Sequence, residues 1–168
     1  MRAEVADAML RVLRDVPGNP SSVHAEGAAA RAELDLARER VASLLGVAPS
    51  EIVFTAGATE ANNTALAAVA ARPDGRRHVV ATAVEHPSVD AALAELEARG
   101  FPVTRVRVGR SGRVAASEVA AALREDTALV TAIWANNETG VLQPIEEIAA
   151  LARARGAWVH SDATQAVG

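Results

Sequence analysis

The stretch TALVTAIW at residues 127–134 is an almost unbroken apolar run that ends in an aromatic residue. A run of this length and composition predicts a β-strand whose two faces are both buried. Such strands are typical of parallel sheets, because the helices that connect parallel strands cover the sheet on both sides. Residues 127–134 therefore predict an α/β fold, with a mostly parallel sheet flanked by helices.

Strand-like and helix-like segments alternate around this stretch. The alternation predicts parallel strands joined by crossover helices. The predicted strands cover residues 51–55, 78–83, 103–108, 127–134 and 157–161, and the predicted helices cover residues 58–71, 88–99, 117–124 and a segment that Pro144 opens. Alternating Val and Arg in residues 103–108 predict a strand at the sheet margin, and Ser117 is predicted to cap the helix that follows.

Two further helices are predicted before the alternating region. Residues 1–16 form a short helix, which Pro17-Gly18-Asn19-Pro20 must end, because proline and glycine disfavour helix continuation. Residues 25–45 carry apolar residues at helical spacing, and Gly46 ends that helix. We expect one partial domain over residues 1–168, with a helix and loop in residues 1–24 and a helix followed by alternating strands and helices in residues 25–168.

The composition excludes several classes of function. A net charge of -4 and a pI near 5.6, with both signs scattered along the chain, leave no basic face for nucleic acid. No apolar run approaches the roughly 18 residues that span a bilayer, so we expect no membrane partner and a cytoplasmic location. The chain has no cysteine, and no metal site is predicted. All 17 of its Lys and Arg residues are arginine, so it has no lysine.

Ligands of open α/β sheets bind at the carboxyl ends of the strands, where this chain is unusually polar. The sequence GATE at residues 57–60 is a glycine turn that opens a helix, where free N–H groups and the helix dipole suit a phosphate. The alternative is that Gly57 or Thr59 only caps the helix. The sequence EHP at residues 85–87 places an imidazole at the sheet rim, where it can stack on a ring or move protons, unless it is an ordinary loop histidine.

Two later strand ends are equally polar. The sequence NNETG at residues 136–140 offers amides to a cofactor oxygen or a substrate carboxylate, with an Asx-rich turn as the alternative. The sequence HSD at residues 160–162 buries a carboxylate, which is costly unless Asp162 meets a cation such as a protonated pyridine nitrogen. The alternative is that Asp162 caps a helix or lies in a loop. The glycosylation patterns at residues 62–64 and 137–139 are interpreted as coincidental.

Taken in order, these motifs closely resemble those of the cysteine desulfurases, which are class V aminotransferases among the fold-type I pyridoxal phosphate (PLP) enzymes. The sequence GNPSSVH at residues 18–24 is similar to the Gly-Asn-Pro-Ser-Ser-x-His signature of that group. The resemblance runs through essentially the whole chain and implies part of the large transferase domain, with PLP as cofactor. The implied cofactor-binding residues are Ala58 and Thr59 at the phosphate, His86 on the pyridine ring, Asn137 at the phenolic side and the substrate, Asp162 at the pyridine nitrogen and Gln165 at the ring oxygen, with His86 also the implied catalytic residue.

The resemblance implies conversion of L-cysteine to L-alanine, with the sulfur held as a persulfide and passed to sulfur-acceptor or iron–sulfur scaffold proteins by a homodimer. The family's PLP-binding lysine, its persulfide cysteine, its first strand and its substrate-binding arginine are all missing here. We therefore expect an amino-terminal fragment that is inactive alone. The alternatives are another class V PLP enzyme such as selenocysteine lyase, or a non-catalytic binding or interaction module that keeps only the cofactor cradle.

Overall fold

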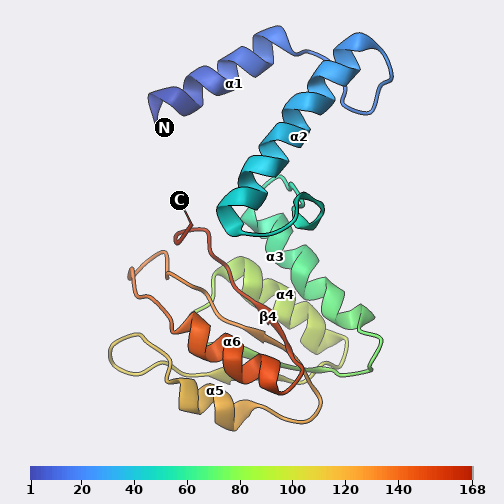
Figure 1. The fold of residues 1–168 in the computed structure, drawn as a ribbon. Helices are drawn as coiled ribbons and strands as arrows, with labels where there is room; N and C mark the ends of the chain where they lie inside the picture. The colour runs from blue at the N-terminus through green and yellow to red at the C-terminus, as the bar shows by residue number, and fades with distance from the viewer. Residues whose placement is uncertain (168) are drawn as a thin grey trace. The chain divides into compact units, whose positions relative to one another are not determined.

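The structure is a computed structural model that describes residues 1–167, shown in Figure 1. The chain forms two compact units, of which the first covers residues 1–54 and the second begins at Thr55. The first unit is helical, and the second contains the sheet. None of the helices in the described part of the chain is long and apolar enough to cross a membrane.

Two helices form most of the first unit, as the sequence predicts. They are α1 (Ala3–Asp15) and α2 (Ala25–Leu45). The second helix ends at Gly46, whose φ of 67° lies in the left-handed region that glycine adopts without strain. The Arg11 guanidinium joins the two helices by donating two hydrogen bonds to the Glu33 carboxylate, each 2.8 Å long. The predicted break between the helices is confirmed.

The loop between α1 and α2 folds tightly against the start of α2. A Cβ atom on Gly18 would overlap the carbonyl oxygen of Glu26, and one on Gly27 would lie 2.5 Å from the carbonyl oxygen of Ser22. Real Cβ atoms do not approach other atoms so closely, so both positions require glycine. The helix is capped by His24, whose Nδ1 accepts a hydrogen bond from Gly27 N at 3.3 Å. The GNPSSVH motif therefore shapes the entry into α2.

The predicted strand at residues 51–55 is wrong. A 3₁₀ turn, η1 (Pro49–Glu51), takes up its first residue, and the rest pairs with no strand in the described part of the chain. The side chain of Arg38 donates to the carbonyl oxygen of Ile52, a group that a sheet ladder would need. A short apolar run favours extended backbone, but it does not supply the neighbouring strand that completes the hydrogen bonds.

Four parallel strands form the sheet of the second unit, in the order β2-β1-β3-β4. They are β1 (His78–Thr82), β2 (Val103–Val106), β3 (Thr127–Thr131) and β4 (Trp158–His160). As predicted, β2 lies at a margin of the sheet. The crossover helices are α4 (Pro87–Ala98), α5 (Ala116–Ala122) and α6 (Ile145–Ala154). Because the strands are parallel, their carboxyl ends share one edge of the sheet.

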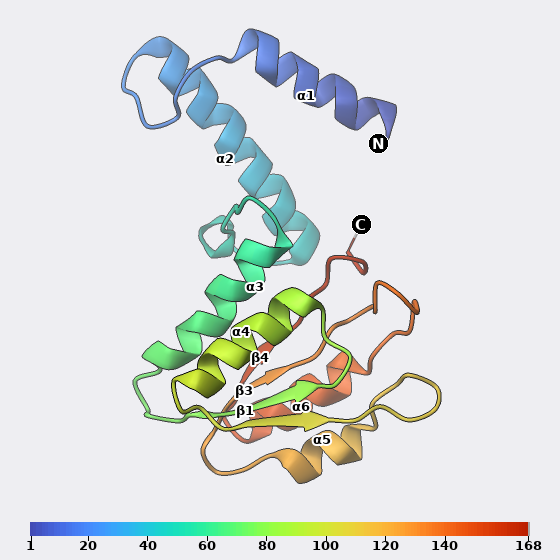
Figure 2. The same ribbon diagram turned by 180° about the vertical axis from the view of Figure 1, so that it is seen from behind.

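Helices cover both faces of this sheet, as Figures 1 and 2 show. One face is covered by α4 and by α3 (Ala58–Ala67) with its 3₁₀ extension η2 (Ala68–Ala71). The other face is covered by α5 and α6. The predicted α/β fold is confirmed, but the predicted cap is wrong. Ser117 already lies inside α5, and the extended residue that precedes the helix is Ala115, which has no capping side chain.

The strands in the middle of the sheet supply side chains to two apolar cores. In β1, Val79 enters the core under α3 and α4 with Leu93, and Val80 enters the core under α5 and α6 with Ile148. Successive residues of a strand point to opposite faces, which explains this division. Every residue of β3 is buried, so the prediction of a strand covered on both faces is confirmed.

We expect Gly27→Ala to destabilise the first unit. The added methyl group would lie 2.5 Å from the carbonyl oxygen of Ser22, and overpacking of this kind costs about 1–3 kcal/mol. Gly109→Ala is the matched control, because its Cβ would lie 3.7 Å from the nearest atom, which is ordinary contact. Urea unfolding followed by circular dichroism should show a lower midpoint for Gly27→Ala alone. Equal urea midpoints in the two variants would show that the loop accommodates the added methyl group without a loss of stability.

Candidate functional site

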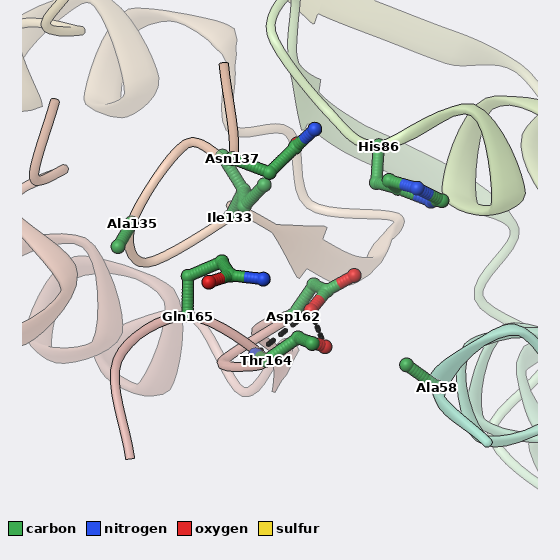
Figure 3. Close-up of a pocket in the computed structure, with 8 residues that line it drawn as sticks. All are labelled: Ala58, His86, Ile133, Ala135, Asn137, Asp162, Thr164 and Gln165. Carbon is green, nitrogen blue, oxygen red and sulfur yellow. Dashed lines mark hydrogen bonds between the residues drawn. The ribbon is translucent and has the colours of Figure 1, made fainter. Parts of the chain in front are cut away.

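One pocket lies where the segments after β1, β3 and β4 meet the start of α3, as Figure 3 shows. Its lining residues are Ala58, His86, Ile133, Ala135, Asn137, Asp162, Thr164 and Gln165. Five of the six predicted cofactor-binding residues are among them: Ala58, His86, Asn137, Asp162 and Gln165. The sixth, Thr59, lies with Ala58 and His86 in a second hollow at the start of α3. The fold therefore brings together the residues that follow separate strands in the sequence.

Asp162 follows β4 and is only 6% exposed. Its Oδ1 accepts hydrogen bonds from Thr164 N at 3.0 Å and Thr164 Oγ1 at 2.6 Å, and its Oδ2 accepts one from Asn62 Nδ2 at 2.8 Å. Burial alone raises the pKa of this carboxyl, but the hydrogen bonds outweigh burial and hold its pKa below the ordinary value. Asp162 therefore places a negative charge in the pocket at neutral pH. The bonds to Thr164 also brace the loop, as the alternative interpretation expects.

His86 occupies the N-cap position of α4. Its Nδ1 accepts a hydrogen bond from Ser88 N at 3.1 Å and lies 2.7 Å from Ser88 Oγ. The imidazole thus takes the place that a Ser or Asp side chain has at many helix starts. Because Nδ1 is used in this way, Nε2 is the ring nitrogen that remains for contacts in the pocket.

The first turn of α3 offers backbone N–H groups beside the pocket. Gly57 holds the N-cap position, and among the described residues no side chain caps this helix. A Cβ atom on Gly57 would meet nothing within 4 Å, so the helix end opens onto free space. Uncapped N–H groups at a helix start attract anions. The alternative interpretation is thus right about the position of Gly57, but Thr59 does not cap the helix.

The two asparagines after β3 have different roles, since Asn136 forms a turn and Asn137 lines the pocket. Asn136 Oδ1 accepts hydrogen bonds from Glu138 N at 3.1 Å and Thr139 N at 2.9 Å, and its Nδ2 donates to the carbonyl oxygen of Val84 at 3.1 Å. Asn136 therefore forms the Asx turn of the alternative interpretation. Asn137, by contrast, lines the pocket and keeps its amide available there.

Glu85 lies behind the pocket wall and is 8% exposed. Its Oε1 accepts hydrogen bonds from Thr82 Oγ1 and, at 2.9 Å, from Ile133 N, whereas Oε2 has no partner among the described residues. Burial raises the pKa of Glu85 to about 7, the charges of Asp90 and Asp162 add to the rise, and the two hydrogen bonds oppose it. Glu85 therefore holds the pocket residue Ile133 while it is itself uncharged below about pH 7.

Glu85 and Asn62 have no role in the sequence-based predictions of the site. Asn62 is 4% exposed and lies four residues before the buried Leu66 on the same face of α3. A polar residue on an apolar helical stripe is the signal that identifies such a position, because buried polar residues need partners. For Glu85 the signal is a carboxylate directly after a buried strand.

The raised pKa of Glu85 should make stability depend on pH. Its pKa is about 7 in the folded chain against an ordinary 4.5, so between these values the folded chain keeps a proton that the unfolded chain has lost. Stability therefore falls as pH rises through this range, by at most about 1.4 kcal/mol per pH unit from this group. The glutamine in Glu85→Gln does not titrate. The free energy of unfolding of this variant should therefore fall less than that of the wild-type chain over the same pH range.

Urea unfolding at pH 5 and pH 7.5 measures this difference. Glu95→Gln, at an exposed position of α4, is the matched control and should follow the wild-type pH dependence. Equal pH dependence in the wild-type chain and in Glu85→Gln would refute the raised pKa.

The sequence matches the family described as aminotransferase class V over residues 1–168. It is 50% identical over 165 residues to a cysteine desulfurase of Enterobacter agglomerans, an alignment that covers 98% of this chain and 41% of that protein. It is 47% identical over 152 residues to a putative cysteine desulfurase, IscS 1, of Bacillus subtilis, covering 90% of this chain and 40% of that protein.

Solved structures agree with these sequence matches. A NifS-like protein superposes with a TM-score of 0.93 at 38% identity, covering 98% of this chain and 46% of that one. A structure described as SspA in complex with cysteine gives a TM-score of 0.92 at 37% identity, covering 99% of this chain and 48% of that one.

The chain spans about two fifths of the length of the curated relatives that it matches. The resemblance in sequence and the expected fold-type I transferase fold are both confirmed. The cofactor of this family is PLP. This chain belongs to the aminotransferase class V family.

Proposed function

We propose that this chain forms the cofactor-binding part of a PLP-dependent cysteine desulfurase, which converts L-cysteine to L-alanine and retains the sulfur as a persulfide. The observation that carries the proposal is the buried, ionised Asp162, which shares one pocket with His86 and Asn137. The similar proteins named as cysteine desulfurases favour L-cysteine over the other substrates of class V enzymes.

The chemistry of the pocket residues fits PLP. The Asp162 carboxylate is the partner that a protonated pyridine nitrogen needs, because a buried charge requires an opposite one. The open first turn of α3 would hold the phosphate at Ala58 and Thr59. Gln165 would hydrogen-bond the ring oxygen, and Asn137 would contact the phenolic side and the substrate. PLP, when bound, supplies a ring that accepts electrons from the substrate carbon.

The pocket residues would then have separate tasks. Asp162 would keep a proton on the ring nitrogen, so that the ring stays positive and can accept the negative charge that develops on the substrate carbon in the transition state. His86 would cover one face of the ring and present Nε2 to the reacting atoms. Thr59 would bind the phosphate equally in the ground and transition states, so it would retain the cofactor without accelerating the reaction.

Two parts of this chemistry need residues beyond the 168. The chain has no lysine for covalent attachment of PLP and no cysteine for the sulfur. The curated relatives are longer than this chain, and we assign both groups to a longer protein that contains it. We assign to the same protein the homodimer and the delivery of sulfur to acceptor or iron–sulfur scaffold proteins. We expect the 168-residue chain alone to bind PLP reversibly and to release no alanine from L-cysteine.

A chimera tests this function. The E. agglomerans cysteine desulfurase with its matched 165 residues replaced by this chain should release alanine from L-cysteine. Within the chimera, Asp162→Asn should lower kcat about a hundredfold, since losing one charge-assisted contact in a dry site costs about 3 kcal/mol of transition-state stabilisation. Thr59→Ala should instead speed the loss of PLP on dilution and leave kcat at saturating PLP nearly unchanged.

Alanine release at saturating PLP and the rate of PLP loss separate these two roles. Asp126→Asn is the matched control, because it makes the same change just before β3, at the opposite end of that strand from the pocket. A folded chimera without desulfurase activity would overturn the proposed function. An Asp162→Asn chimera with wild-type turnover would remove Asp162 from the mechanism.

A further inference from the structure

We propose that Asn62 is the positioning residue of the pocket. It holds the Asp162 carboxylate directly and, through Ser88, holds His86 with its ring proton on Nε2. The inference deepens the proposed function, and its test by PLP binding rests on that function. It concerns four residues, which lie in α3, at the start of α4 and after β4, far apart in the sequence.

Asn62 uses both hydrogens of its amide. Nδ2 donates to Asp162 Oδ2 at 2.8 Å and to Ser88 Oγ at 3.0 Å. The residue is 4% exposed, so water competes little for these bonds. A single amide therefore ties the anionic group of the pocket to the residue that contacts the imidazole.

The orientation of this amide follows from two of its partners, Asp162 and His160. Asn62 Oδ1 lies 3.2 Å from His160 Nε2, and His160 Nδ1 lies 2.8 Å from Thr131 Oγ1. The Asp162 carboxylate only accepts, so Nδ2 must face it and Oδ1 must face His160. Burial lowers the pKa of His160, so its ring is neutral. Because Asn62 Oδ1 only accepts, the ring proton of His160 lies on Nε2, which donates to Oδ1.

The proton of His86 follows by the same reasoning. The backbone N–H of Ser88 points at His86 Nδ1 at 3.1 Å, so Nδ1 carries no proton. Ser88 Oγ already accepts from Asn62, and its own hydrogen is free to donate to His86 Nδ1 at 2.7 Å. Both groups of Ser88 therefore face the single lone pair of Nδ1, and the neutral ring holds its proton on Nε2.

This arrangement determines what His86 can do. The neutral ring can donate a hydrogen bond from Nε2 to an atom in the pocket. Protonation at Nδ1 would remove the lone pair that accepts from Ser88 N and caps α4. Asn62 thus favours a ring that offers the pocket a hydrogen-bond donor at Nε2, the nitrogen that the helix cap leaves free.

Nuclear magnetic resonance of the 168-residue chain without PLP tests the network itself. Ring ¹H–¹⁵N correlations of His86 should show a protonated Nε2 and an unprotonated Nδ1 in the wild-type chain. Asn62→Leu keeps the side-chain size and removes all three hydrogen bonds, so the pKa of Asp162, followed by carboxyl ¹³C titration, should rise and the His86 Nδ1 resonance should move. Ser88→Ala should move the His86 Nδ1 resonance and leave the Asp162 titration unchanged. It therefore tests the contact between Ser88 and His86 even if Asn62→Leu unfolds the chain.

The neighbouring Asn63→Ala is the matched control. Asn63 is exposed, and within the described part of the chain its side chain donates only to the carbonyl oxygen of Thr59 in α3, at 2.8 Å. It should leave both the Asp162 titration and the His86 resonances unchanged. A proton on Nδ1 of His86 in the wild-type chain would overturn the proposal. So would an Asn62→Leu chain whose Asp162 titration and His86 resonances match those of Asn63→Ala.

Binding of PLP and of its 1-deaza analogue, in which C–H replaces the ring nitrogen, separates positioning from general damage. Asn62 acts on that nitrogen through Asp162, so Asn62→Leu should raise the Kd for PLP about tenfold and leave the Kd for the analogue within about twofold. Equal losses for both ligands would indicate a merely structural residue. If the wild-type chain binds both ligands equally, the proposed contact of Asp162 with the ring nitrogen fails, while the resonance measurements still decide the network.

Discussion

A carboxylate buried as deeply as Asp162 stays ionised only where hydrogen-bond donors or an opposite charge offset its burial. One donor group is Thr164, two residues away, and the other is Asn62, 100 residues away in the sequence. The backbone of Asp162 is also held, because its carbonyl oxygen accepts from Trp134 N at 2.9 Å. The extension of the sheet beyond β3 and β4 therefore sets where the carboxylate lies. The charge of the pocket depends on the pairing of these strands.

The elements of the second unit could be predicted because each carries a local signal, such as the apolar run that becomes β3. Residues 51–55 contain a shorter apolar run and form no strand, since pairing depends on a neighbour that the local sequence does not specify. Ser117 fails as a cap for a related reason. A cap needs extended backbone before the first helical residue, and the chain places Ala115 there.

The pocket residues after the strands could be predicted from topology, because parallel strands end at one edge of the sheet. Asp162 and His86 follow directly from that rule. Asn62, Ser88 and Glu85 do not, because their importance lies in contacts across the chain. In the sequence, Asn62 is one polar residue in an otherwise ordinary helix, and only the fold shows that its amide meets a buried carboxylate.

The two buried carboxyl groups at this edge differ in charge, and their surroundings explain why. Asp162 accepts three hydrogen bonds that offset its burial, whereas Glu85 has one oxygen with no partner among residues 1–167 and has the charge of Asp162 nearby. The anion at Asp162 thus helps to keep Glu85 protonated. Two buried anions would require two cations, while one anion and one neutral acid require a single positive charge. In the proposed function, a lone protonated pyridine nitrogen would supply that charge, so the unequal pKa values of the pair suit a pocket for one cationic ring.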